Sequence, residues 1–298
     1  MDIAEHETRV VSRRDIRQSI AWQKYMSALR WNVVPMKNAV GYCKRLPLLG
    51  SIIKFPRCPS TINLMNVEKS AQQHQAFLVK IEPTTCSSTD LERFKKHGFL
   101  LSHQSTTPTS TLQVDLTQSI EHLWQDVHSS TRTKINRSKK FGLKIVKSVD
   151  IDEFANLWSS SARRRGWMLG QSSHITTLWS SAPPSARLLL LCKDKTTLLA
   201  GVFLLFYDKT AYYMYACTTD EGRQTPASHM LAWNAIRRSK KQRMSVFDFE
   251  GVADNSTPSS WKGFSFFKTG FGGTVVHFPK PFSKLPRWAQ YLPTIATM

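Results

Sequence analysis

Two short segments near the C-terminus combine residue types that could bind a ligand and stabilise developing negative charge. The first, Phe247–Gly251 (FDFEG), alternates two acids with two phenylalanines at the predicted end of a strand. The second, Phe266–Gly273 (FFKTGFGG), places Lys268 among aromatic residues and glycines. Glycines let backbone N–H groups approach a ligand closely, and a lysine in such a setting can stabilise developing negative charge. Composition alone favours the alternative, a glycine-rich turn that carries an exposed lysine.

A third segment is strongly basic. Residues 131–147 (TRTKINRSKKFGLKIVK) hold seven Lys or Arg and no acid, in a chain whose net charge is +20. Like charges at this spacing repel one another on a helix, and a polyanion would relieve that repulsion. The segment is therefore a candidate RNA-binding site, although a merely solvated face stays open as the alternative. The candidate tRNA contacts are Arg132, Lys134, Arg137, Lys139 and Lys140.

Other classes of protein are disfavoured. The five cysteines are scattered without a C-x-x-C pair, which argues for a reducing cytosol and against a disulfide framework or a zinc site. No Ser/His/Asp triad or metal-ligand cluster is evident, so no metal is expected. The N-terminus lacks an apolar signal segment, and the longest apolar run, 198–207, is too short to span a bilayer. We expect a cytoplasmic protein, with any membrane contact peripheral, at the inner face of the plasma membrane.

The expected elements alternate between strands and helices. Helices are predicted at 18–31, from 120 to a stop at Gly142, and at 150–165. In the last third, strands at 187–193, 198–207 and 210–217 precede a helix at 227–241, a strand at 245–249, a short helix at 264–268 and a strand at 274–278. This order predicts an α/β (α+β) fold with mixed, mostly antiparallel sheets, as in N-acyltransferase domains.

The two C-terminal segments, DFEGVAD and GFSFFKTGFGG, resemble the ending of the FemABX family of peptidoglycan interpeptide-bridge aminoacyltransferases. Looser similarities follow in order along nearly the whole chain, in QSIAWQKYMSALRW, LPLLGSIIKFPRCP, AFLVKIEP, TRTKINRSKKFGLKI and YYMYACTTDEGRQTPASHMLAWNAIRRSKK. The resemblance implies two tandem GNAT-like domains, with acceptor binding in residues 1–120 and aminoacyl transfer in 121–298. It also implies that an amino acid moves from aminoacyl-tRNA, as co-substrate without a further cofactor, to the stem peptide of a UDP-linked or lipid-linked precursor.

The resemblance assigns candidate roles to single residues. Lys268 and Glu82 match catalytic positions, Lys24 a lysine that holds precursor phosphate, and Phe267 the aromatic residue before the lysine. Tyr213 and Tyr215 match tyrosines of the acceptor cleft, and strand alternation predicts that they share one face. We therefore expect a cleft between the domains, with Lys24 and Glu82 facing the two tyrosines.

The sequence also departs from the family pattern. Cys58 stands in place of a glycine, Glu82 in place of the more familiar aspartate, and Gly170 and His174 where one pattern has Arg and Tyr.

Two other functions stay open. An acyl-CoA-dependent N-acyltransferase of the same fold, acting on an envelope or polysaccharide precursor, would need a turn that cradles pyrophosphate. The corresponding stretch is 223–228 (RQTPAS), in which Pro226 supplies no N–H. The other is a non-catalytic RNA- or envelope-binding module, which the basic segment alone would support.

Overall fold

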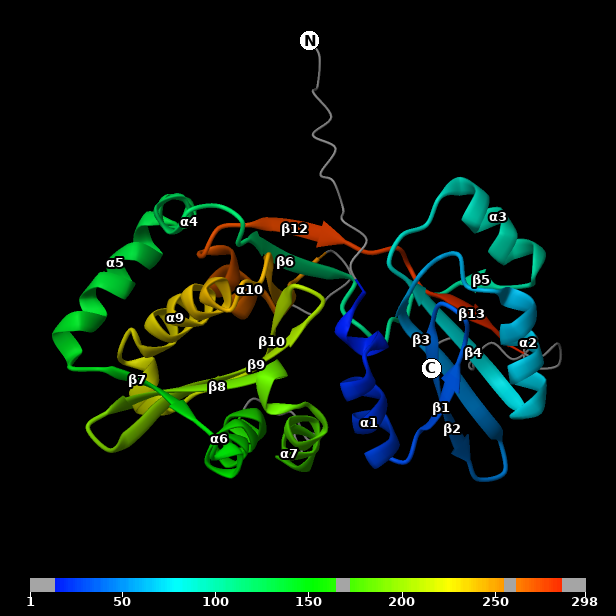
Figure 1. The fold of residues 1–298 in the computed structure, drawn as a ribbon, viewed down its shortest axis with the longest axis horizontal. Coiled ribbons are helices and arrows are strands. Elements are labelled where there is room, and N and C mark those ends of the chain that lie inside the picture. Colours follow the sequence, from blue (N-terminus) through cyan, green and yellow to red (C-terminus); the bar gives the residue numbers. More distant parts are fainter. Residues whose placement is uncertain (1–13, 165–171, 255–260, 286–298) are drawn as a thin grey trace, which may run out of the picture.

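The computed structural model describes residues 14–164, 172–254 and 261–285. Two mixed sheets, each with its own helices, lie beside one another along the long axis of the molecule (Figure 1). Both contain one parallel strand pair among antiparallel ones, so the predicted α/β fold with mixed, mostly antiparallel sheets is confirmed. Within these residues, no helix is long and apolar enough to cross a membrane.

The first sheet has six strands in the order β1-β2-β3-β4-β13-β5. Helices α2 (Leu64–Gln73) and α3 (Ser88–Lys96) cover one face, over a core that includes Phe55, Phe94 and Phe282. Its strands are β1 (Asn32–Pro35), β2 (Val40–Leu46), β3 (Gly50–Cys58), β4 (Ala76–Pro83), β5 (Leu100–Leu101) and β13 (Phe282–Lys284).

Helix α1 (Ile20–Ala28) joins the two halves. It begins at Ser19, whose side chain accepts a hydrogen bond from Trp22 N at 3.1 Å, a standard N-cap. The helix lies between the first sheet and α7 (Ser172–Ser181) of the second half (Figure 1). Its buried Tyr25 and Met26 belong to the same apolar cluster as residues of that half, so packing across the junction fixes the helix.

The second sheet has seven strands in the order β12-β6-β11-β10-β9-β8-β7. Helix α9 (Ala227–Lys241) covers one face, and α6 (Ile151–Arg164) and α7 cover the other. The strands are β6 (Ser110–Asp115), β7 (Lys144–Ser148), β8 (Arg187–Asp194), β9 (Thr197–Tyr207), β10 (Thr210–Thr218), β11 (Val246–Gly251) and β12 (Thr274–His277).

The chain crosses between the two sheets twice. The predicted division into residues 1–120 and 121–298 does not include these crossings. Strand β6 precedes residue 120 but pairs with β11 and β12 in the second sheet. Strand β13, near the C-terminus, returns to the first sheet and pairs with β4 and β5. Each half is therefore completed by a segment from the other part of the sequence.

The helix expected from 120 to Gly142 is interrupted. The structure has α4 (Ile120–Asp126), α5 (Ser129–Arg137) and a 3₁₀ turn at Ser138–Phe141, which ends at Gly142 in the left-handed conformation (φ 65°). Val127 is extended, and His128 N donates to Gly270 O at 3.0 Å, so the backbone turns there toward α10 (Lys262–Thr269). The apolar periodicity continues through the break, which is why the sequence does not reveal it.

Replacing Phe282 by alanine should destabilise the first domain by about 3–5 kcal/mol, the usual loss for a buried phenylalanine. Phe282 is 1% exposed and its ring stacks on Phe94 with centroids 4.2 Å apart. Urea unfolding would measure the loss, with Phe266→Ala (75% exposed) as a control expected to change stability by about 0.5 kcal/mol or less. Equal stability of the two variants would contradict the role of β13 in this core.

Candidate active site

The central strands of the second sheet separate at one end. β10 and β11 pair in parallel only from Thr210 with Val246 to Tyr212 with Asp248. Beyond that point β10 contains a bulge at Met214, and β11 turns at Glu250, whose φ is +60°. Backbone groups at a split between strands are available to a ligand.

Asp248 lies at the branch point and holds the turn of β11. Its carboxylate accepts hydrogen bonds from Thr111 Oγ1, from Gln113 Nε2 at 2.9 Å and from Glu250 N at 2.7 Å. Burial, followed by the neighbouring charge of Glu250, raises the pKa of Asp248 to about 6, although these hydrogen bonds oppose the rise. All three donors sit on β6 and β11, so this acid fixes the local backbone.

Glu250 points from that turn to the first domain. Its Oε2 accepts from Arg17 Nη2 at 2.6 Å, and Arg17 also pairs with Asp15 at 3.1 Å. The backbone at Arg17 is also held in place, because Tyr42 Oη donates a hydrogen bond to Arg17 O at 2.7 Å. Burial is the largest influence and acts to raise the pKa of Glu250, but the charge and hydrogen bond of Arg17, together with the charges of Arg57 and Lys268, outweigh it and the pKa is lowered. The Arg17–Glu250 ion pair therefore joins the two domains at the point where β10 and β11 separate.

Lys268 reaches the same place from α10. Its Nζ donates to Gly251 O at 2.6 Å and lies 5.1 Å from the centroid of the Phe264 ring. Burial lowers the pKa of Lys268 to about 8, against the opposing charges of Glu250 and Asp248. The structure thus brings the two C-terminal segments together around a lysine that changes charge near neutral pH.

Phe267 packs behind this lysine. The half-buried ring contacts His229 (centroids 5.0 Å apart) and Phe271 (5.2 Å apart). Burial lowers the pKa of His229 to about 4, so this imidazole is neutral at physiological pH. Phe267 therefore supports α10 from the core side.

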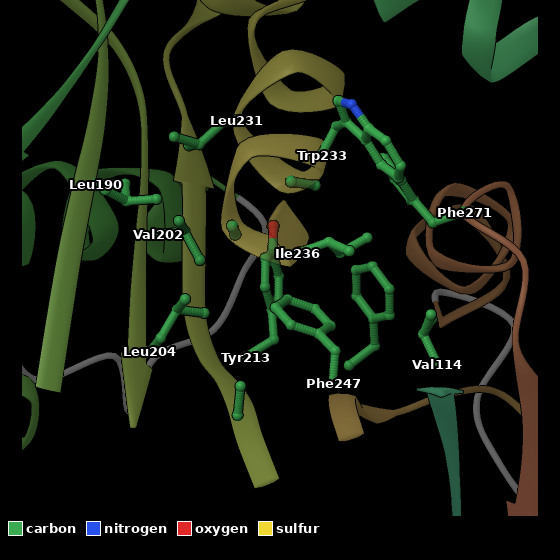
Figure 2. Packing of buried hydrophobic residues seen from close by; sticks show 14 of the residues in the cluster. Val114, Leu190, Val202, Leu204, Tyr213, Leu231, Trp233, Ile236, Phe247 and Phe271 are labelled. Atoms are coloured by element: carbon green, nitrogen blue, oxygen red, sulfur yellow. The ribbon is translucent and has the colours of Figure 1, made fainter. Parts of the chain in front are cut away.

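The two tyrosines do not share a face. Met214 is the extra residue of the bulge, so Tyr213 pairs with Leu204 while Tyr215 pairs with the adjacent Phe203. Tyr213 belongs to the core under α9, where it points toward Phe247 (Figure 2). Tyr215 lies on the opposite face, toward α1. The inserted residue breaks the alternation on which the prediction depended.

Glu82 serves a structural purpose. The carboxylate is 3% exposed and accepts five hydrogen bonds from Ser105, Thr106 and Thr107. It therefore clamps the loop that precedes β6. Lys24 is exposed on α1.

Of the four residues expected in the cleft, Tyr215 packs against the apolar cluster at the domain junction, whereas Tyr213 lies in the core under α9. Tyr25 of α1 and Tyr215 of β10 meet in the same apolar cluster, so α1 packs close to β10. Arg17 lies within electrostatic reach of Tyr215 and of Lys54, and Lys54 in turn lies within reach of Glu82. Arg17 is thus the residue that connects the two sides.

The five candidate tRNA contacts of the basic segment fall into two groups, one structural and one exposed to solvent. Arg132 Nη1 donates to Gln125 O at 2.8 Å and to Val127 O at 2.6 Å, so its guanidinium caps the end of α4. The other four side chains are exposed on α5 and the following turn, and are Lys134, Arg137, Lys139 and Lys140. These four retain the features expected of a phosphate-binding surface.

Sequence reasoning missed the inter-domain charges. Arg17 was not singled out, and it is 233 residues from Glu250. The sequence does show that Asp248 and Glu250 alternate with two phenylalanines. This alternation indicates that the phenylalanines face the core and that both acids face away from it. No local signal pairs them with Arg17. Among the described residues, no cluster of three or more His, Cys, Asp or Glu could hold a metal ion.

Two sheets of this topology, each with one parallel pair, define a tandem N-acyltransferase fold. Similarity to solved structures agrees. FemX matches with a TM-score of 0.79 and 16% identity over 94% of each chain. The C-terminal domain of a putative lysylphosphatidylglycerol synthetase from Agrobacterium fabrum matches with a TM-score of 0.63 and 13% identity, over 90% of this chain and 88% of that one. A tandem GNAT protein from the clavulanic acid biosynthesis pathway matches with a TM-score of 0.52 and 11% identity, over 85% and 81%.

The FemAB family model matches residues 186–293, which contain β8 to β13 and Lys268. The predicted resemblance is therefore confirmed for this part of the chain, and these matches support an acyltransferase. No curated protein matches the chain in sequence.

Arg17→Met should cost about 3–5 kcal/mol of unfolding free energy, because it leaves Glu250 buried without its partner. The two side chains are 9% and 16% exposed. Adding Glu250→Gln should restore much of the loss, since the uncompensated charge is gone. The more exposed Lys193–Glu153 pair is a control, and Lys193→Met should cost about 1 kcal/mol or less. If the double variant were no more stable than Arg17→Met, the pair would not be coupled.

Binding of bulk tRNA should weaken with salt. If the four exposed cations each neutralise a phosphate of single-stranded RNA, the slope of log affinity against log salt should be about −3. Replacing Arg137, Lys139 and Lys140 by glutamine should reduce it to about −1, whereas Lys95→Gln with Lys96→Gln on α3 should leave it unchanged. An unaltered slope in the triple variant would place the RNA site elsewhere.

Proposed function

We propose that this protein is an aminoacyl-tRNA-dependent transferase that adds an amino acid to the stem peptide of a peptidoglycan precursor. The observation that carries the proposal is Lys268, held beside the split of β10 and β11 within the FemAB-like part of the chain. The match to FemX over most of the chain supports the same class of reaction.

The reaction is the aminolysis of an ester. The acceptor amine nitrogen attacks the aminoacyl carbonyl carbon, a C–N bond forms, and the C–O bond to the tRNA ribose breaks. The amine loses a proton and the ribose oxygen gains one, so the step balances without a further co-reactant. Because the ester is already activated, the protein mainly aligns the reactants and stabilises the oxyanion.

Lys268 is the proposed oxyanion donor. Its ammonium donates a hydrogen bond to Gly251 O, which holds it at the end of β11. The negative charges of Glu250 and Asp248 favour the protonated form of Lys268. A pKa of about 8 also allows the neutral amine to form at mildly alkaline pH. Glu82 is not assigned the base, since both of its oxygens bind the 105–107 loop.

A thioester of coenzyme A is the less suitable donor. The turn before α9 would have to offer free N–H groups to a pyrophosphate. Here Gln224 N and Thr225 N donate to Glu221 O and Gly222 O, and Ala227 N donates to Thr225 Oγ1. Pro226 has no N–H to offer. The N–H groups of Gln224, Thr225 and Ala227 are therefore already used within the turn.

The donor is tested by competition. The protein is incubated with nucleotide-linked precursor and an equimolar mixture of bulk aminoacyl-tRNA and acetyl-CoA. The proposal expects aminoacylated precursor alone, and acetylated precursor alone would refute it.

Lys268→Met should lower the transfer rate by about 10²–10³-fold, the usual loss for one oxyanion donor. With wild-type protein the rate should fall above pH 8, where Lys268 loses its proton. Lys268→Arg should retain part of the rate and show no such fall up to about pH 10, because a guanidinium keeps its proton. Lys262→Met, on an exposed part of the same helix, is the control expected to behave as wild type. Near-normal transfer by Lys268→Met would remove this residue from the mechanism.

A further inference from the structure

One face of the first sheet carries a row of polar residues across four strands. Tyr42 pairs with Lys54, Lys54 with Lys80, and Lys80 with Ser283. Directly paired residues project from the same face of a sheet. The opposite face is the apolar one beneath α2 and α3, so this row faces α1 and the domain junction.

Two lysine ammonium groups of this face gather at one tryptophan. Lys54 Nζ lies 4.4 Å from the centroid of the Trp31 ring, and Lys44 Nζ lies 5.8 Å from it. Trp31 follows α1, so the contact is made where that helix meets the sheet. Lys54 is half-buried.

The positive charges of this face lack acid partners. Lys44 Nζ donates to Leu29 O and Lys80 Nζ to Gln104 O, each at 2.8 Å, and both acceptors are uncharged. Within residues 14–164, 172–254 and 261–285, no acid lies at ion-pair distance from Lys44, Lys54 or Lys80. Glu82 is the acid whose charge acts on Lys54 and Lys80, and its oxygens are used by the 105–107 loop.

This arrangement is costly in the absence of a ligand. Like charges directly opposite on neighbouring strands destabilise a sheet, and Lys54 and Lys80 are such a pair. Burial lowers the pKa of both lysines, and the charges of Arg17 and Lys80 lower the pKa of Lys54 further. An anion placed between them would relieve both effects.

We propose that Lys44 and Lys54 at Trp31, together with Lys80 beside Lys54, form an oxyanion-binding subsite for the acceptor, separate from Lys24. The site lies next to Arg17, whose partner Glu250 acts on Lys268, so an acceptor held here extends toward the reactive end of the second domain. This inference rests on the proposed function for the identity of the acceptor. The chemistry of the subsite itself requires only a phosphate or carboxylate group.

The test uses the full chain and the tryptophan in the subsite. Inorganic pyrophosphate is titrated at low ionic strength while tryptophan emission is recorded, and the same titration of Trp31→Phe is subtracted. A saturable change is expected in the difference signal. Lys54→Met should weaken it by about tenfold, as for the loss of one charge-assisted hydrogen bond. Lys95→Met, on the far side of the sheet, should leave it unchanged.

Two further ligands identify the natural oxyanion. If Lys54→Met weakens binding of UDP-N-acetylglucosamine, which carries phosphate but no carboxylate, and does not weaken binding of the free stem peptide, the group is a phosphate. The reverse result identifies a peptide carboxylate. No difference signal with any ligand, or equal binding by Lys54→Met and wild type, would overturn the subsite. A protein that gives the signal but transfers no amino acid would instead refute only the proposed function.

Discussion

Asp248 is a carboxylate buried where β10 and β11 part, and three donors from β6 and β11 hold it there. Because Glu250 N is one of the donors, the backbone turns and Glu250 takes a left-handed conformation that costs a non-glycine residue about 1 kcal/mol or more. This turn aims Glu250 at Arg17 and leaves Gly251 O to accept from Lys268. The placement of the catalytic candidate and the inter-domain contact thus depend on one buried acid.

The two domains are joined by more than a linker. Arg17 binds Glu250, α1 packs against α7, and β13 completes the first sheet after the chain has built the second. A ligand held between the domains would therefore meet a fixed junction. Cations outnumber acids on the side of that junction formed by β2, β3 and β4, which matches an acceptor that carries phosphate and carboxylate groups.

The order of strands and helices in the last third was predictable because it depends on local patterns, whereas the tandem domains and the role of Lys268 were implied by the resemblance to the FemABX family. The DFEG and FFKTG segments and the alternating strands of the last third lie where those patterns indicated. Features set by distant or inserted residues were not predictable. One extra residue at Met214 placed Tyr213 in the core, and the 105–107 loop, more than twenty residues from Glu82, occupied that acid. Arg132 caps α4 because the helix breaks at Val127, which the continuous periodicity concealed.

The most direct measurement is the mass of the acceptor after reaction. Purified protein is incubated with bulk aminoacyl-tRNA and either nucleotide-linked or lipid-linked precursor, and the precursor is analysed by tandem mass spectrometry. The account predicts that one precursor gains the mass of a single amino acid residue on an amine of its stem peptide, and that deacylated tRNA gives no change. Unchanged masses of both precursors, with a preparation that binds charged tRNA, would contradict it.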